Sequence, residues 1–378
     1  MVERPVPFLS DTDATVRLVQ VTSKWITDIE IERSKQITRD NTQRTRRHHF
    51  VPQMYLKRWS DEDELVRFTD TVTGAGDVDL PDAIANEEFF YRIAGEDIDP
   101  DEHPDLWFET HMGRIEDKAA GWLRALDRHP DGRVKDPNLL HNLAVFIALQ
   151  SQRTPRSRAF ELDLDAAIQR FDPRTVIGNR LALPVICRTL GIPYSPQQHA
   201  EIVEQILARP EFSSDPTAKA IDNSIKVWCN HIVPMFACRR RWWLVTSQTA
   251  LITCDDPVVP VQAPDWPRTR VARFDSPLLL YPIDPHRLLV GTPTDQVLTK
   301  PFTLTEAEAG DVNLEIASHC LRFLYEHPGS DIGAHISLPR MPEFDPAQAA
   351  TFWEAMSPPT RWSDAADPPP WPLQRWTS

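Results

Sequence analysis

The stretch TAKAIDNSIKVWCNHIVPMFACRRRWWLVTSQTALIT, residues 217–253, contains the point at which the chain changes from one kind of structure to another. Up to Cys238, apolar residues recur at the three- and four-residue spacing of an amphipathic helix. After Arg241 come two short runs of apolar and β-prone residues, 242–245 and 250–253. The stretch therefore predicts a helix followed by strands.

The same two patterns continue on either side of this stretch. Helical spacing is also found at 105–128, 139–152, 163–170, 180–190, 197–207 and 305–324. Further strands are expected at 276–281 and 288–290. The simplest architecture is an α+β fold, in which a helix-rich first half packs on a small, mainly antiparallel sheet from the second half.

The charge of the chain limits the partners that it can have. The 378 residues carry a formal net charge of -14 and a pI near 5.3, which argues against a general attraction to nucleic acid or to a membrane. The segment from Ile31 to Arg58 is the exception, because its eight Lys and Arg residues face only Glu32 and Asp40. This basic segment either meets a phosphate-bearing partner or docks on the acidic surface of the protein itself.

Cysteine usage and hydropathy bear on the location of the protein. Five cysteines without a CxxC pair argue against a disulfide framework or a zinc knuckle, and for reduced thiols. No stretch approaches the ~18 consecutive apolar residues of a membrane span, and the N-terminal region lacks the apolar core of a signal peptide. We therefore expect a cytoplasmic protein.

The two ends of the chain differ from its middle in composition. Residues 1–44 mix polar residues with isolated apolar ones and are expected to form an N-terminal arm. Residues 346–378 combine many prolines with Trp362, Trp371 and Trp376, which disfavours regular structure and favours an extended strap along the body. A single domain is expected from 45 to 345.

Hydrogen-bonding side chains are concentrated around one proline in the segment HHFVPQMYLKRW, residues 48–59. Proline favours the first turn of a helix, so a helix is expected to start at Pro52. His49, Gln53 and Tyr55 would then form a small polar pocket able to hold an anion or to orient a metal-bound imidazole. The alternative is an entry turn whose imidazole is hydrogen-bonded internally.

Two carboxylates share a helix face that is otherwise apolar. Glu109 and Glu116 lie seven residues apart, and a buried carboxylate requires a cation, a metal or several donors. Gln150 and Arg153 continue the apolar face of the next helix, which makes Arg153 the natural partner of Glu116. The pair either braces two helices or joins His49 in a divalent-metal site of the kind that hydrolyses phosphate esters.

The acidic pair in Asp255-Asp256-Pro257 follows a β-prone run. Its carboxylates could bind a divalent cation through oxygen, or form a turn by bonding their own backbone. The neighbouring Cys254 would be a nucleophile only beside a base, and the sequence supplies none at a telling distance. The sequence contains no Gly-rich phosphate loop, no HExxH and no GxSxG element. This argues against the common dinucleotide- and NTP-binding loops.

Four blocks of sequence occur in an order that resembles a known family. They are HHFVPQMYL (48–56), FIALQ running into RTP (146–155), LITCDDPV (251–258) and the pair Pro277-Leu278 with two prolines close by. Together they resemble the bacterial family catalogued as domain of unknown function 4238, over roughly residues 45–325. Asp255 aligns with an aspartate of that family.

Two departures from the family pattern affect what can be inferred from it. Cys254 stands where serine is usual, and residues 280–283 replace a Leu-Ser-Pro run, which speaks against a catalytic role for those serine positions. The resemblance implies no agreed activity.

Two functions fit these residues. The first is a hydrolase acting on a phosphodiester or nucleotide, in which His49, Glu116 and Asp255 are catalytic. Gln53, Tyr55, Gln150 and Arg153 would then bind the substrate, and a divalent metal would be held by His49, Glu88, Glu116 and Asp255. The second is a non-catalytic ligand-binding or sensing module, in a defence or stress setting, in which the same groups recognise a ligand.

Overall fold

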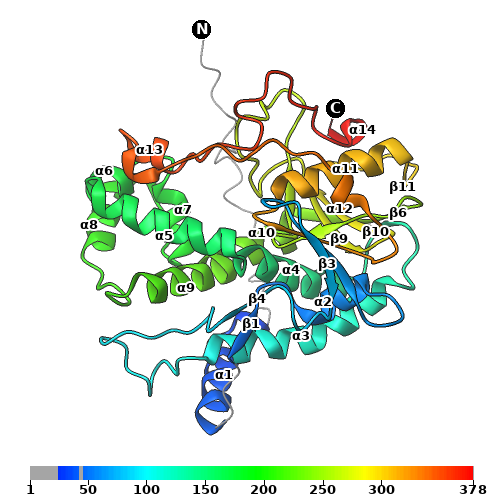
Figure 1. The fold of residues 1–378 in the computed structure, drawn as a ribbon. Helices are drawn as coiled ribbons and strands as arrows, with labels where there is room; N and C mark the ends of the chain where they lie inside the picture. The colour runs from blue at the N-terminus through cyan, green and yellow to red at the C-terminus, as the bar shows by residue number, and fades with distance from the viewer. Residues whose placement is uncertain (1–23, 42–45, 378) are drawn as a thin grey trace.

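The computed structural model describes residues 24–41 and 46–377, and its fold is α+β, as the sequence predicts. A mainly helical part and a mainly β part lie side by side (Figure 1). Both parts share one apolar core cluster, which includes Trp25 and Trp376. Among the described helices, none combines the length and the apolarity that crossing a membrane requires.

The helices of the first part are η1 (Lys24–Ile26), α1 (Asp28–Asp40), α2 (Gln53–Leu56), η2 (Lys57–Trp59), α3 (Trp107–Leu126), α4 (Pro137–Gln152), α5 (Pro155–Arg170), α6 (Pro173–Ile177), α7 (Leu183–Thr189), η3 (Pro196–Gln198), α8 (His199–Leu207), α9 (Pro216–Val227), η4 (Trp228–Ile232) and α10 (Val233–Cys238). Most of them agree with the predicted ranges to within a few residues, but α5 begins eight residues before the predicted 163–170, and α1 and several short helices are not predicted. The helix predicted up to Cys238 is divided, because η4 is a π-helical turn between α9 and α10.

A repeated signal in the sequence explains where several helices begin. Asp136, Thr154, Asp172 and Asp215 each accept a hydrogen bond from a first-turn N–H, and each is followed by proline. The acceptor satisfies a donor that the helix leaves free, and proline has no N–H to lose there. The Thr154-Pro155 pair therefore starts α5 directly after α4 has ended, and Arg153 lies at the junction.

The larger sheet has the strand order β11-β6-β10-β9-β8, with β5 paired to β6. Its strands are β5 (Gly132–Arg133), β6 (Arg240–Ser247), β8 (Val259–Val261), β9 (Leu278–Asp284), β10 (Arg287–Pro293) and β11 (Thr303–Leu304). Every residue of β9 is buried, which suits its unbroken apolar run. The β9–β10 register shifts at Arg287, so the end of this hairpin is irregular.

Two smaller sheets contain strands that the sequence does not predict. One has the order β3-β2-β12-β7 and the other pairs β1 with β4. Their strands are β1 (Arg47–His49), β2 (Val66–Asp70), β3 (Gly76–Asp79), β4 (Asn86–Glu88), β7 (Thr253–Cys254) and β12 (Phe323–Glu326). The first four strands are short and largely polar, and β3 is exposed along its whole length, so no alternating apolar pattern marks them.

The remaining helices cover the β part and the end of the chain. They are α11 (Glu306–His319), α12 (Ile332–His335), η5 (Pro346–Gln348), α13 (Phe352–Ala355) and α14 (Gln374–Thr377). Residues 346–377 cross the molecule as an extended strap with short helical turns, from α13 beside α5 to α14 beside α11 (Figure 1).

The domain boundaries at residues 44 and 345 stay predictions. Of the predicted N-terminal arm, the structure shows the helix α1, while residues 1–23 and 42–45 lie outside the described residues.

Candidate functional site

Arg153 lies at the centre of a polar group that we call the Arg153 cluster: His49, Tyr91, Glu109, Glu116 and Arg153. Arg153 is 2% exposed. Its Nη1 forms an ion pair with Glu116 of α3, and its Nη2 donates to the main-chain oxygen of His49 in β1. Its Nε donates to Tyr91 Oη at 3.3 Å, and the Tyr91 hydroxyl donates to the main-chain oxygen of Arg153 at 2.5 Å. A single guanidinium therefore connects β1, α3 and the end of α4.

The helix-bracing interpretation of the Glu116–Arg153 pair is thus seen directly. Arg153 is the residue at which α4 ends, and capping of the next helix by Thr154 fixes the chain on its other side. Glu116 remains 20% exposed at its side chain, so the cluster approaches the surface there.

Glu109, two helical turns before Glu116 on α3, has the most unusual carboxyl of the cluster. Burial raises the pKa of Glu109 to about 7, Arg153 opposes this rise, and the charge of Glu116 adds to it. Its Oε2 is buried without a hydrogen-bond partner among the described residues. Glu109 therefore exchanges its proton near neutral pH, which is the property of a general acid or base.

His49 meets Arg153 through its main chain, whereas its imidazole lies on the Gln53 side. His49 Nε2 is 3.2 Å from the main-chain oxygen of Asp82, and Gln53 Nε2 is 3.4 Å from both ring nitrogens. Burial lowers the pKa of His49, and the positive charge of Arg153 lowers it further against the hydrogen bond to Asp82. The ring is therefore neutral at neutral pH and donates from Nε2 to the carbonyl of Asp82.

Gln150 and Tyr55, which the sequence places in a substrate pocket, lie deep in the interior. Gln150 is fully buried, and neither atom of its amide has a partner among the described residues. The Tyr55 hydroxyl lies 2.7 Å from Thr253 Oγ1 and donates to the main-chain oxygen of Pro282 at 2.6 Å. Tyr55 therefore fastens α2 to the β part.

Asp255 is positioned by the turn between α11 and β12, away from the Arg153 cluster. Its carboxylate accepts hydrogen bonds from the backbone N–H groups of Leu321, Arg322 and Phe323 at 2.7–2.8 Å. Burial raises the pKa of Asp255, and these three donors act in the opposite direction. The Asp255 carboxylate therefore stabilises the turn between α11 and β12, which is distant from it in the sequence. The sequence suggests instead a local turn, in which the carboxylate bonds its own backbone.

The four residues expected to hold a divalent metal are not all brought together. Glu88 in β4 is 62% exposed at its side chain and pairs with Arg46 at 3.5 Å, and Asp255 bonds the turn described above. Within residues 24–41 and 46–377, no three His, Cys, Asp or Glu side chains are arranged to hold one metal ion. Of the predicted site residues, His49, Gln53, Glu116 and Arg153 are the ones that lie in or beside a common cluster.

Two residues of this region were not found from the sequence. Tyr91 is buried, bonds Arg153 and stacks on His48 with ring centroids 5.9 Å apart. His48 is also buried, and its Nδ1 accepts from the Tyr91 N–H at 2.9 Å. No periodic pattern surrounds Tyr91, so the sequence does not indicate its buried position. The His48-His49 pair, in contrast, marks this segment as a place for polar contacts.

The comparison with protein families agrees with the motif blocks. Residues 47–330, more than half of the chain, match the family described as "Protein of unknown function (DUF4238)", and the chain belongs to that family. The resemblance seen in the sequence is thereby confirmed. Neither a curated protein nor a solved structure matches the chain.

Proposed function

We propose that the protein is a hydrolase acting on a phosphodiester or a nucleotide, with the Arg153 cluster as its acid–base centre. The observation that carries the proposal is Glu109, a carboxyl with an unpartnered oxygen and a pKa raised to about 7 by burial. Protonated, it can supply a proton to a leaving oxygen, and ionised, it can take one from water. Arg153 is then a positioning residue that holds Glu116 and the main chain of His49 beside it.

The chain provides a matched control for Glu109. Glu161 on α5 is also buried, and burial likewise raises its pKa to about 7, against a hydrogen bond to Asn223. An isosteric Glu→Gln change at either position removes a titrating group of the same kind. Only Glu109 lies beside Arg153 and Glu116, so a catalytic effect should be specific to it.

Hydrolysis of bis(4-nitrophenyl) phosphate, 4-nitrophenyl phosphate and nucleoside triphosphates, with and without Mg²⁺, Mn²⁺ or Zn²⁺, tests the proposal. We expect Glu109→Gln to lower kcat about 100-fold or more, the usual worth of a general acid or base, while Glu161→Gln stays close to wild type. Equal losses in both variants, or none in Glu109→Gln, would refute it.

A second function, the non-catalytic ligand-binding or sensing module, is favoured by the use that the structure makes of Arg153 and Asp255. The hydrogen bonds of both side chains connect separate elements of the fold. The binding-module alternative is supported if the wild-type protein hydrolyses none of these substrates while His49→Ala weakens ligand binding or lowers stability. For both functions we propose a cytoplasmic location, because the five free thiols suit a reducing compartment.

A further inference from the structure

A basic groove lies apart from the Arg153 cluster, between the η2 turn and the β9–β10 hairpin. It has a volume of about 830 Å³ and shares no lining residue with that cluster. Five of its lining side chains are basic and one is acidic: Lys57, Arg58, His286, Arg287, His327 and Asp284. The whole protein has a net charge of -14, so a groove lined mainly by basic side chains differs in sign from the rest of the molecule.

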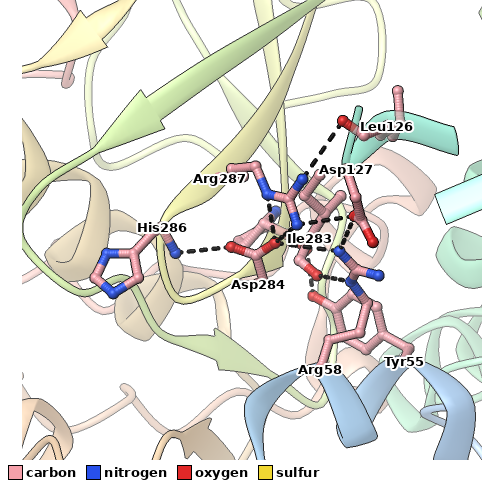
Figure 2. A network of polar contacts seen from close by, with 9 residues as sticks. Tyr55, Arg58, Leu126, Asp127, Ile283, Asp284, His286 and Arg287 are labelled. Atoms are coloured by element: carbon pink, nitrogen blue, oxygen red, sulfur yellow. Dashed lines mark hydrogen bonds and ion pairs between the residues drawn. The ribbon is translucent and has the colours of Figure 1, made fainter. Parts of the chain in front are cut away.

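Two arginines of the groove are fixed in place by two aspartates (Figure 2). Arg58 Nη2 is 2.6 Å from Asp127 and 3.2 Å from Asp284, and its Nε donates to the Ile283 main-chain oxygen at 2.7 Å. Arg287 Nη2 is 2.8 Å from Asp127 and 2.6 Å from Asp284. Both guanidinium groups are therefore held before any ligand arrives, which reduces the entropy lost on binding.

The two carboxylates that hold these arginines lie differently with respect to the groove. Asp284 is buried, with Oδ1 accepting from the His286 N–H at 2.8 Å and Oδ2 taken by the two arginines. Asp127 does not line the groove. Among the described residues nothing accepts a hydrogen bond from Arg58 Nη1, which also carries no dashed line in Figure 2.

Lys57 and His327 are less constrained than the two arginines, whereas His286 Nδ1 lies 3.1 Å from the Ser247 main-chain oxygen. Lys57 is exposed and forms no ion pair within the described part of the chain. His327 Nδ1 accepts from the Gly329 N–H at 3.0 Å, so the proton of a neutral His327 ring is on Nε2, where it can be donated. An exposed Lys57 and a fixed Arg58 together suit the charge and the shape of a phosphate group.

We propose that this groove binds the phosphomonoester of a small organic molecule. The terminal phosphate would lie against Lys57 and Arg58, and the organic part would extend towards His286 and His327. The volume of the groove lies in the usual range for small-molecule sites and exceeds what a lone phosphate ion fills. Binding here is separate from the hydrolysis proposed above.

Calorimetric titration of the full chain with AMP, glucose 6-phosphate, inorganic phosphate and adenosine tests this inference. We expect saturable binding of at least one of the two phosphomonoesters and none of adenosine. Lys57→Ala should raise Kd about tenfold or more, because an exposed cation is lost from the phosphate end. Lys135→Ala, an exposed lysine outside the groove, should leave Kd within about twofold of wild type.

Two further variants separate the possible failures. Arg58→Lys keeps a cation beside the aspartates but loses the planar fork, so it should weaken binding while the protein stays folded. Glu109→Gln should leave binding unchanged, whatever it does to hydrolysis. The proposal is overturned if neither phosphomonoester binds, if Lys57→Ala binds like wild type, if adenosine matches AMP, or if inorganic phosphate binds as tightly as both esters.

Discussion

Glu109 illustrates how its surroundings determine the chemistry of one side chain. The ordinary pKa of a glutamate is 4.5, and burial raises that of Glu109 to about 7 although Arg153 is near. Glu116, on the same face of α3, instead makes the ion pair with Arg153. Two carboxylates on one helix therefore differ in role because only one of them reaches the guanidinium directly.

The raised pKa of Glu109 makes the stability of the fold depend on pH. A carboxyl whose pKa is higher in the folded protein binds its proton more tightly there. Its stabilising contribution is complete below 4.5 and is lost as the pH rises through about 7. We expect urea unfolding between about pH 4 and 8 to show wild type losing about 3 kcal/mol relative to Glu109→Gln. A difference that does not change with pH would contradict the raised pKa.

At the residue scale, the sequence predicts an ion pair between two buried side chains better than it predicts main-chain partners from distant segments. Glu116 and Arg153 could be matched because a buried charge on each of two apolar faces needs a partner. The partners of Asp255 could not be predicted, because they are main-chain N–H groups more than sixty residues away that only the fold brings close. The basic groove could not be predicted for the same reason, since its residues come from four separate segments of the chain.

At the scale of elements, Arg153 joins a strand and two helices. Replacing it by alanine would leave Glu116 and the main-chain oxygen of His49 without their partner. We expect Arg153→Ala to lower the free energy of unfolding by about 3–5 kcal/mol, measured with urea.

The double variant Arg153→Met/Glu116→Leu is the control for this prediction. It removes both charges and keeps apolar volume, so it should recover most of the loss if the pair is only a brace. A double variant as unstable as Arg153→Ala would show that the hydrogen bonds to Tyr91 and His49 matter more than the ion pair.

The predicted elements succeeded where the chain gives a periodic pattern with a clear start. Helices α4 and α9 have both apolar spacing and a capping residue before proline, and both are predicted. Of α5 only residues 163–170 are predicted, although Thr154 caps its start before Pro155. Strands β1 to β4 were missed, because strands of three to five residues with exposed positions are fixed by their partners in space.

At the scale of the whole molecule, the strap of residues 346–377 ties the helical part to the β part. At one end Arg170 of α5 donates to the main-chain oxygens of Pro346 and Ala349. At the other end Trp371 Nε1 donates to the Trp266 main-chain oxygen at 2.7 Å, and its ring covers Arg268 at 4.0 Å. Arg268 in turn pairs with the buried Glu315 of α11.

This docking predicts a large effect at one tryptophan and a small one at another. Trp371 is 5% exposed and belongs to the main core cluster, so Trp371→Ala should cost about 3–5 kcal/mol. Trp353 in α13 is 50% exposed, and Trp353→Ala should cost less than about 1 kcal/mol. Urea unfolding of the two variants decides the matter, and similar small losses would mean that the strap adds little.

The strap has a consequence for how the molecule is made. Trp25 and Trp376 belong to the same apolar cluster, so the core closes only when segments from opposite ends of the described chain have met. During synthesis, the helices up to α10 leave the ribosome before the later strands and the strap with which they share this cluster. Until residue 376 has emerged, this cluster is incomplete, and we expect the folding of the full chain to end late.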